Sequence, residues 1–397
     1  MRYISTRGEA APLGFSAAVA TGLAPDGGLF LPEQMPDISG RLRGWEGLPY
    51  AELCFEFLRL FADDIPTETL RDIVRRSYTR FTDPAIAPLK QLTPNLHVLE
   101  LFHGPTLAFK DVAMQLLARL MDHALAARNE RTTVVVATSG DTGGAAVEAF
   151  RGRDRADLFV LYPKGRVSDV QRLMMTTAPD DNVHALEIEG TFDDCQAIVK
   201  GLFNHHAFRD RVSLSGVNSI NWARIVAQVV YYFTAAATLG APNRKVAFTV
   251  PTGNFGDIFA GYVAKRMGLD IDRLVIATNV NDILARTLAT GTYDVREVVA
   301  TSSPSMDIQV SSNFERLLFE ATGRDAAAVR ALMASLTQSK SFSMSDAALS
   351  EMRALFSADR ATEEECAATI RTALRETGHL IDSHTAVAVA EIGRAHV

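Results

Sequence analysis

The chain has 397 residues, of which 47% are hydrophobic and 22% charged, and its formal net charge at pH 7 is -7. This length allows two or three domains, and an acidic chain without a basic run is not expected to bind nucleic acid. No apolar stretch approaches the roughly 20 residues of a membrane span, and no secretory signal is recognisable. The three cysteines, Cys54, Cys195 and Cys366, are far apart, which argues against a disulfide framework and a cysteine-based zinc site. We therefore expect a soluble, cytoplasmic protein with no metal and no membrane partner.

The first part of the chain is rich in turn signals and short helical patterns. Pro25-Asp-Gly-Gly28 marks a turn, and residues 51–61 and 67–80 carry apolar residues at helical spacing. We interpret residues 1–95 as an α-rich N-terminal domain.

A lysine follows at the junction of a loop and a helix. Residues 112–128 have helical spacing, so Asp111 is the expected N-cap and Lys110 lies at the positive end of the helix dipole. Burial and positive potential lower the pKa of a lysine, and a neutral lysine is the nucleophile that forms Schiff bases. On this stretch alone, a chance lysine at a loop–helix junction is the commoner explanation.

The middle of the chain alternates strands and helices. Short β-branched or apolar runs at 133–137, 158–162 and 183–188 are each followed by a helical pattern. After a long helix over 219–239, strands at 245–250 and 274–278 repeat the rhythm, and the last third is mostly helical. This pattern predicts an α/β fold with two parallel-sheet domains and a ligand cleft between them. We assign 131–214 to a small α/β domain, and 96–130 with 215–397 to a large one.

Two glycine-rich loops lie between a strand and a helix, where backbone N–H groups can bind an anion. One is Pro251-Thr-Gly-Asn-Phe-Gly256, which matches neither a Rossmann fingerprint nor a P-loop. The other is Thr138-Ser-Gly-Asp-Thr-Gly-Gly144, in which Asp141 would repel an anion and therefore either accepts a hydrogen bond or caps the helix. Ordinary turns remain the alternative for both loops. A reactive lysine with two anion sites is what a pyridoxal-phosphate enzyme acting on an amino acid requires.

Several specific motifs, in the same order, resemble those of the threonine synthases, in the fold-type II family of pyridoxal-phosphate enzymes. The resemblance covers nearly the whole chain. It is carried by Tyr3-Ile-Ser-Thr-Arg-Gly8, Gly22-Leu-Ala-Pro-Asp-Gly-Gly-Leu-Phe-Leu-Pro32, Leu107-Ala-Phe-Lys-Asp111, Thr138-Ser-Gly-Asp-Thr-Gly143, Ser219-Ile-Asn-Trp-Ala-Arg224, Pro251-Thr-Gly-Asn-Phe-Gly-Asp257 and Ser305-Met-Asp-Ile308. It implies a tryptophan synthase β-like fold with pyridoxal 5'-phosphate bound between the two α/β domains.

The resemblance also implies site residues. Lys110 would bind the cofactor and then act as general base and acid. The residues expected at the cofactor, most of them around its phosphate, are Gly253, Asn254, Phe255, Gly256, Asp257 and Asp141. Those expected at the substrate are Ser139, Thr142, Asn221 and Arg224. Asn221 and Arg224 lie three residues apart on one helix, so both could reach a substrate phosphate. The alternative for Arg224 is an ion pair with a surface acid.

The implied reaction converts O-phospho-L-homoserine and water to L-threonine and phosphate by β,γ-elimination and replacement. The first alternative is another fold-type II lyase or synthase, such as a dehydratase or a cysteine synthase relative. The second is a catalytically silent α/β protein that binds a metabolite through the same loops. Whether the chain is a monomer or a homodimer stays open.

The C-terminal segment Asp382-Ser-His-Thr-Ala-Val387 resembles the family's Asp-Pro-His-Thr-Ala-Val. The family continues for several tens of residues beyond it, so we expect the chain to be truncated. The residue that contacts the pyridine nitrogen is then expected beyond residue 397. Residues 391–397 depart from the family, and we expect them not to be native.

Overall fold

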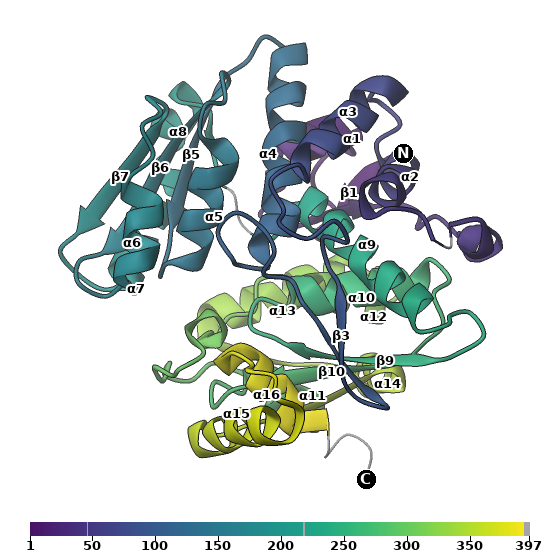
Figure 1. Ribbon diagram of the computed structural model, residues 1–397. Helices are drawn as coiled ribbons and strands as arrows, with labels where there is room; N and C mark the ends of the chain where they lie inside the picture. Colours follow the sequence, from purple (N-terminus) through teal and green to yellow (C-terminus); the bar gives the residue numbers. More distant parts are fainter. Residues whose placement is uncertain (46, 217–218, 393–397) are drawn as a thin grey trace.

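Two separate parallel sheets form the α/β part of the molecule, as the sequence predicts. This computed structural model describes residues 1–45, 47–216 and 219–392. The strands of the first sheet are β5 (Thr132–Ala137), β6 (Ala156–Pro163), β7 (Val183–Ile188) and β8 (Leu214–Ser215). They pair in the order β7-β6-β5-β8, and Val134 of β5 lies opposite Leu158 of β6 (Figure 1). Their helices are α5 (Asp141–Phe150), α6 (Asp169–Thr176), α7 (Phe192–Asn204) and α8 (His206–Arg211).

The second sheet has β9 (Val246–Pro251), β10 (Ile271–Thr278) and β13 (Phe356–Arg360), in the order β13-β10-β9. Its surroundings are mostly helical, as expected. The helices are α10 (Gly256–Arg266), α11 (Ile283–Thr290), η2 (Pro304–Met306), α12 (Phe314–Ala321), α13 (Ala326–Ser339), α14 (Asp346–Leu355), α15 (Glu363–Thr377) and α16 (Ser383–Ile392). A small antiparallel pair, β11 (Thr292–Asp294) and β12 (Ser341–Ser343), completes this part.

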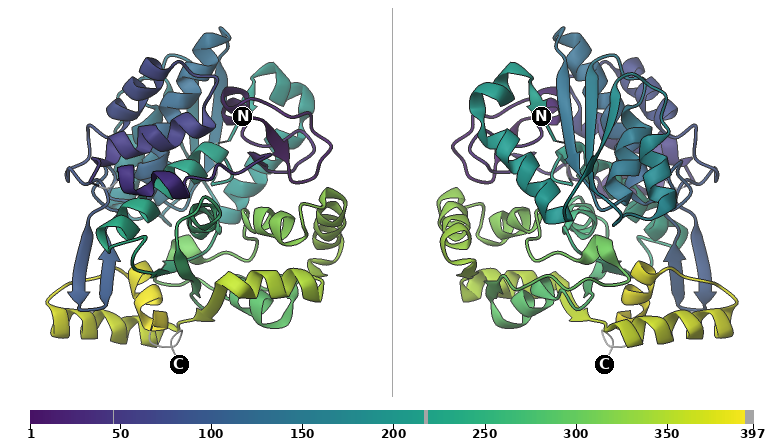
Figure 2. Two further views of the ribbon diagram at one scale, coloured as in Figure 1. Left: turned by 90° about the vertical axis from the view of Figure 1, so that its right-hand side faces the viewer. Right: turned by 90° about the vertical axis from the view of Figure 1, so that its left-hand side faces the viewer.

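The N-terminal part is α-rich and begins with a short antiparallel pair. Its elements are β1 (Tyr3–Ser5), α1 (Phe15–Thr21), β2 (Phe30–Pro32), η1 (Ser39–Trp45), α2 (Tyr50–Phe61) and α3 (Thr67–Ser77). A hairpin that the sequence analysis missed, β3 (Leu89–Thr93) and β4 (Leu96–Leu99), leads out of it. Figure 2 shows this hairpin running down toward α15. The domain boundaries at 95, 131 and 214 stay a prediction.

Two long helices, α4 (Lys110–Ala127) and α9 (Trp222–Thr238), form the centre of the molecule. Both are buried on nearly every face, which is typical of helices packed inside a core. One apolar cluster connects them with the N-terminal helices and with α10. No helix among the described residues is long and apolar enough to cross a membrane.

Arg316 of α12 joins the N-terminal part to the centre. Its side chain is fully buried, and its guanidinium donates hydrogen bonds to the carbonyl oxygens of Phe30 and Ile220 and to Oδ1 of Asn313. The same group lies 5.6 Å from the ring of Trp222. Burial lowers the pKa of Arg316 to about 9. This arginine therefore binds backbone carbonyls of two chain segments and one side chain, and no carboxylate among the described residues forms an ion pair with it.

Replacing Arg316 by Ala should lower the free energy of unfolding by about 3 kcal/mol or more, because three buried acceptors lose a charged donor. Urea unfolding and thermal melting measure the loss. Arg375→Ala is the control, since Arg375 is exposed and contacts only the surface groups Glu376 and Thr372 among the described residues, so its loss should change stability by about 0.5 kcal/mol or less. Equal effects of the two variants would contradict this account of Arg316.

Candidate active site

Lys110 is the first residue of α4, and its helix begins two residues earlier than expected. The N-cap is Phe109, so the prediction of Asp111 as N-cap is wrong. The Asp111 carboxylate instead accepts hydrogen bonds from the amide and the hydroxyl of Thr106, both at 2.7 Å. A Cβ on Gly104 would lie 2.5 Å from that of Asp111, so only glycine fits there. These contacts fix the turn that presents Lys110.

The Lys110 amine is buried and bonded to two polar groups. Its Nζ donates to Oδ2 of Asp141 at 3.3 Å and to Oγ of Ser305 at 3.4 Å, and only 8% of the residue is exposed. Burial lowers the pKa of Lys110, and the charge of Arg224 lowers it further, while the Asp141 carboxylate opposes the shift. The expected downward shift is thus present, and its largest cause is burial.

Asp141 is the acceptor at the centre of the site. It occupies the first turn of α5, whose N-cap is Gly140 at φ 141°, so Asp141 does not cap the helix. Its carboxylate accepts hydrogen bonds from Ser305 Oγ at 2.8 Å and from Gln171 Nε2 at 2.6 Å. Burial alone would raise the pKa of Asp141, but Lys110 and these hydrogen bonds lower it. Of the two tasks considered for Asp141, accepting hydrogen bonds is confirmed.

The loop around Asp141 is organised by Thr138, which the sequence analysis did not single out. Its hydroxyl accepts the amides of Gly140 and Gly143, both at 2.9 Å. Within the described part of the chain, the amides of Ser139, Asp141 and Thr142 have no acceptor. Ser139 is exposed. These free donors at a helix N-terminus suit a carboxylate or another anion.

The second glycine-rich loop, between β9 and α10, also presents free donors. The backbone amides of residues 253–257 have no acceptor among the described residues. Phe255 adopts the left-handed conformation at φ 63°, and its buried ring packs against Phe314 and Phe356. A bulky residue in this conformation is strained, and such strain clusters at ligand sites. The loop therefore fits the phosphate of a cofactor.

Asp257 contributes to this loop only through its backbone. Its buried carboxylate accepts the hydroxyls of Tyr231 at 2.5 Å and Tyr232 at 2.9 Å on α9. Burial raises its pKa. Asn254 is exposed, and its carbonyl oxygen accepts from the amide of Asn313.

The two halves of the site meet at Gly253. A Cβ there would lie 2.9 Å from the carbonyl oxygen of Ser305, so the glycine allows the two loops to touch. Ser305 in turn contacts Lys110 and Asp141. Gly256 lies alongside Ser219 in the segment before α9. Lysine, carboxylate and glycine-rich loop are thus brought together from both sheets.

Asn221 and Arg224 have different surroundings. Asn221 is the N-cap of α9: its Oδ1 accepts from the amide of Ala223, and its Nδ2 donates to the carbonyl of Val19 at 2.8 Å. Nδ2 has a second N–H group, so the expectation that Asn221 also reaches an anion stays a prediction.

Arg224 is buried, with 4% of its surface exposed, so the alternative that it forms an ion pair with a surface acid is wrong. Its side chain has no hydrogen-bond or ion-pair partner in the described residues. Burial lowers its pKa to about 10. A buried guanidinium without an acceptor is suited to an anionic ligand.

Besides Thr138 and Gln171, the residues Ser305 and His384 were missed as site residues. Ser305 lies in the quoted motif 305–308, and His384 in the quoted motif 382–387, so motif membership was the available signal. Both contact groups far away in the chain, which spacing cannot reveal. No group of three His, Cys, Asp or Glu side chains suited to a metal occurs among the described residues.

Comparison with known proteins decides the family. Residues 84–339 match the family described as "Pyridoxal-phosphate dependent enzyme", and residues 2–78 match "Threonine synthase N terminus". Threonine synthase of Pseudomonas aeruginosa is 52% identical over 98% of this chain and 83% of the relative. The chain belongs to the threonine synthase family of pyridoxal-phosphate enzymes.

Solved structures agree. The structure titled as PLP-bound threonine synthase from Brucella melitensis is 60% identical, with a TM-score of 0.97, and the match covers 100% of this chain and 86% of that one. Yeast threonine synthase gives 42% identity and a TM-score of 0.94, covering 99% and 83%. The expected fold class and cofactor are confirmed. The expectation that residues 391–397 are not native falls mostly on residues 393–397, which lie outside the described residues.

Opposite charges around Lys110 predict opposite effects on its pKa. Asp141→Asn removes a charge that raises this pKa, so the pKa should fall further. Arg224→Met removes a charge that lowers it, so the pKa should rise. The rate at which Lys110 of the cofactor-free chain reacts with an amine-specific reagent, followed against pH, measures both. Shifts in the same direction for both variants would contradict this electrostatic account.

Proposed function

We propose that this enzyme converts O-phospho-L-homoserine and water to L-threonine and phosphate. The observation that carries the proposal is the buried amine of Lys110, which lies near a second buried cation, Arg224, and between two loops with free amides. Family membership supports the reaction type. In the net reaction the bond from Cγ to the phosphate oxygen and one Cβ–H bond break. The hydroxyl of water adds at Cβ, and the proton from Cβ and the remaining proton of water go to Cγ and to the released phosphate.

The residues present fit pyridoxal 5'-phosphate. The amides of 253–257, at the positive end of α10, would hold its phosphate, and Lys110 would bind it covalently. When bound, this cofactor supplies an electron sink for negative charge developing at the substrate.

Lys110 is the group that would move protons. A lysine whose pKa is lowered by burial is neutral in a larger fraction of molecules, and can accept a proton from Cα and return one to the substrate. Asp141 and Ser305 hold Nζ by hydrogen bonds, which limits the positions that the amine can occupy. Positioning of this kind contributes to rate because the reacting groups start close to their productive geometry.

Arg224 would bind the substrate phosphate, and the free amides of Ser139 and Thr142 would bind its carboxylate. An arginine binds phosphate through two parallel N–H groups, and burial strengthens the interaction because water does not compete. Asn221 caps the N-terminus of α9 and would thereby fix the first turn of the helix, which carries Arg224.

A dehydratase or cysteine synthase relative needs no second phosphate site. The unpartnered Arg224 therefore favours the phosphorylated substrate over these alternatives. Turnover assays with O-phospho-L-homoserine, threonine and O-acetylserine test the choice directly. A cytoplasmic location stays a proposal, supported by three free, buried cysteines. Monomer and homodimer stay equally open.

Lys110→Ala should abolish the absorption band of the lysine-bound cofactor while the protein stays folded, because this variant lacks the amine that binds it. Borohydride reduction of the wild-type enzyme, followed by peptide mass mapping, should place the cofactor on Lys110. A reduced adduct on any other lysine would contradict the assignment of Lys110.

Arg224→Met should reduce kcat/KM for O-phospho-L-homoserine about a hundredfold or more, since a charged hydrogen-bond donor to the phosphate is lost. Inhibition by inorganic phosphate should weaken in parallel, and cofactor affinity should change little. Stability should rise, because the variant removes a buried charge that has no partner. Loss of cofactor with unchanged phosphate inhibition would instead assign Arg224 to the cofactor.

A further inference from the structure

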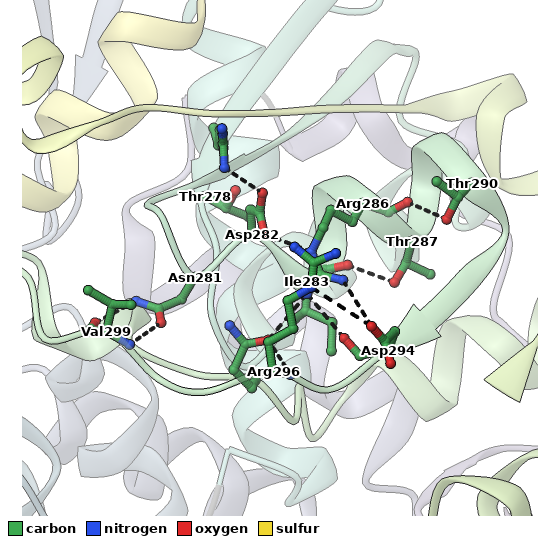
Figure 3. A network of polar contacts seen from close by, with 12 residues as sticks. Thr278, Asn281, Asp282, Ile283, Arg286, Thr287, Thr290, Asp294, Arg296 and Val299 are labelled. Carbon is green, nitrogen blue, oxygen red and sulfur yellow. Dashed lines mark hydrogen bonds and ion pairs between the residues drawn. The ribbon is translucent and has the colours of Figure 1, made fainter. Parts of the chain in front are cut away.

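The loop that carries Ser305 is anchored at both ends. At its start, Asn281 exchanges two hydrogen bonds with the backbone of Val299, each 2.8 Å long (Figure 3). Near its end, the Asp307 carboxylate accepts hydrogen bonds from the side chains of Asn279 at 2.8 Å, Asn281 at 3.0 Å and Thr301 at 2.7 Å. These contacts fix the ends of the loop but none of them touches Ser305.

The middle of the loop is held by the first residues of α16. The backbone amide of Ser305 donates to Nε2 of His384 at 3.2 Å. The neighbouring hydroxyl of Ser383 donates to the carbonyl oxygen of Ser302 at 2.5 Å. Two consecutive residues of α16 thus hold two points of the loop, and only His384 reaches the residue that contacts Lys110 and Asp141.

The contacts of His384 also define its protonation state. Because Nε2 accepts a hydrogen bond from an amide, it carries no proton, and the proton lies on Nδ1. Nδ1 is 3.4 Å from Oδ1 of Asp382, whose carboxylate also accepts the amides of His384 and Thr385. A carboxylate at this position orients the ring, as carboxylates do for other functional histidines.

We propose that His384 is a positioning residue of the active site, which acts through the backbone amide of Ser305. Its ring fixes Ser305, so that the Ser305 hydroxyl points at the Asp141 carboxylate and meets the Lys110 amine. The link connects the start of α16 to the reacting amine through one serine. The inference rests on the proposed role of Lys110.

A pair of matched substitutions in the full-length chain tests this role. His384→Gln can place its amide oxygen near the position of Nε2, whereas the shorter side chain of His384→Asn reaches only as far as Nδ1. We expect His384→Asn to lower kcat/KM tenfold to a hundredfold, the range that a misplaced reacting group produces. His384→Gln should restore most of the activity. Ser383→Ala, which removes only the contact with Ser302, is the control and should stay within about threefold of wild type.

A double-mutant cycle separates action through Ser305 from general weakening of α16. If His384 acts through Ser305, combining His384→Asn with Ser305→Ala should cost no more than Ser305→Ala alone. The same cycle is measured on the dissociation constant of pyridoxal 5'-phosphate, followed by absorbance without substrate. That readout keeps the test valid even if the substrate is not O-phospho-L-homoserine.

The result that overturns the proposal is additivity of the two losses, in kcat/KM and in cofactor affinity. Equal effects of His384→Asn, His384→Gln and Ser383→Ala would overturn it too, because the acceptor at Nε2 would then be irrelevant. Melting curves of all variants show whether a loss reflects unfolding, and the Gln variant, which keeps the acceptor, decides the question if the Asn variant does not fold.

Discussion

The buried contact between the Lys110 amine and the Asp141 carboxylate is the interaction on which the rest of the site depends. Removing an ion pair from water costs free energy unless hydrogen bonds satisfy both partners. Here Ser305 and Gln171 complete the shell of the carboxylate. The participants come from α4, from the first sheet and from the loop beside the second sheet. The complete set of hydrogen bonds around the contact therefore forms only when both sheets are in place, which couples the fold to the chemistry.

The loops around this contact are held in conformations that they would not adopt alone. Phe255 is left-handed, and Gly140 lies at a φ that side chains rarely tolerate. Each residue lies in a short loop between a strand and a helix, and these rigid elements hold the strained backbone in place. The Phe255 ring is fixed between Phe314 and Phe356, and Arg316 ties α12 to the N-terminal part. Core packing thus stabilises backbone arrangements that leave amides free for anions.

Sequence reasoning predicted five strands of the two parallel sheets, β5, β6, β7, β9 and β10, together with most of the helices and the two loops, because hydrophobic periodicity and glycine placement are local signals. It missed β13, whose residues Phe356–Arg360 have little intrinsic strand preference and become a strand by pairing with β10. Tertiary pairing overrides propensity in such cases. It misassigned the N-cap of α4 to Asp111, and it did not foresee that Asn221 caps α9, for a related reason. The carboxylate of Asp111 accepts a hydrogen bond from Thr106, and the side-chain amide of Asn221 donates one to the carbonyl of Val19. The helical pattern reveals neither contact.

Two buried cations, Lys110 and Arg224, lie close enough that each influences the site of the other. Among the described residues, Asp141 is the one carboxylate bonded to Lys110, and none of them neutralises Arg224. The excess positive charge keeps the amine of Lys110 closer to neutrality and at the same time attracts an anion. A ligand that brings a phosphate to Arg224 removes the excess, so that its binding stabilises the folded chain. It also lets the pKa of Lys110 rise, since the opposing charge is then compensated. The same imbalance that weakens the cofactor-free chain thus attracts a phosphate, and the bound phosphate then raises the basicity of the Lys110 amine, which helps that amine to accept a proton from the substrate.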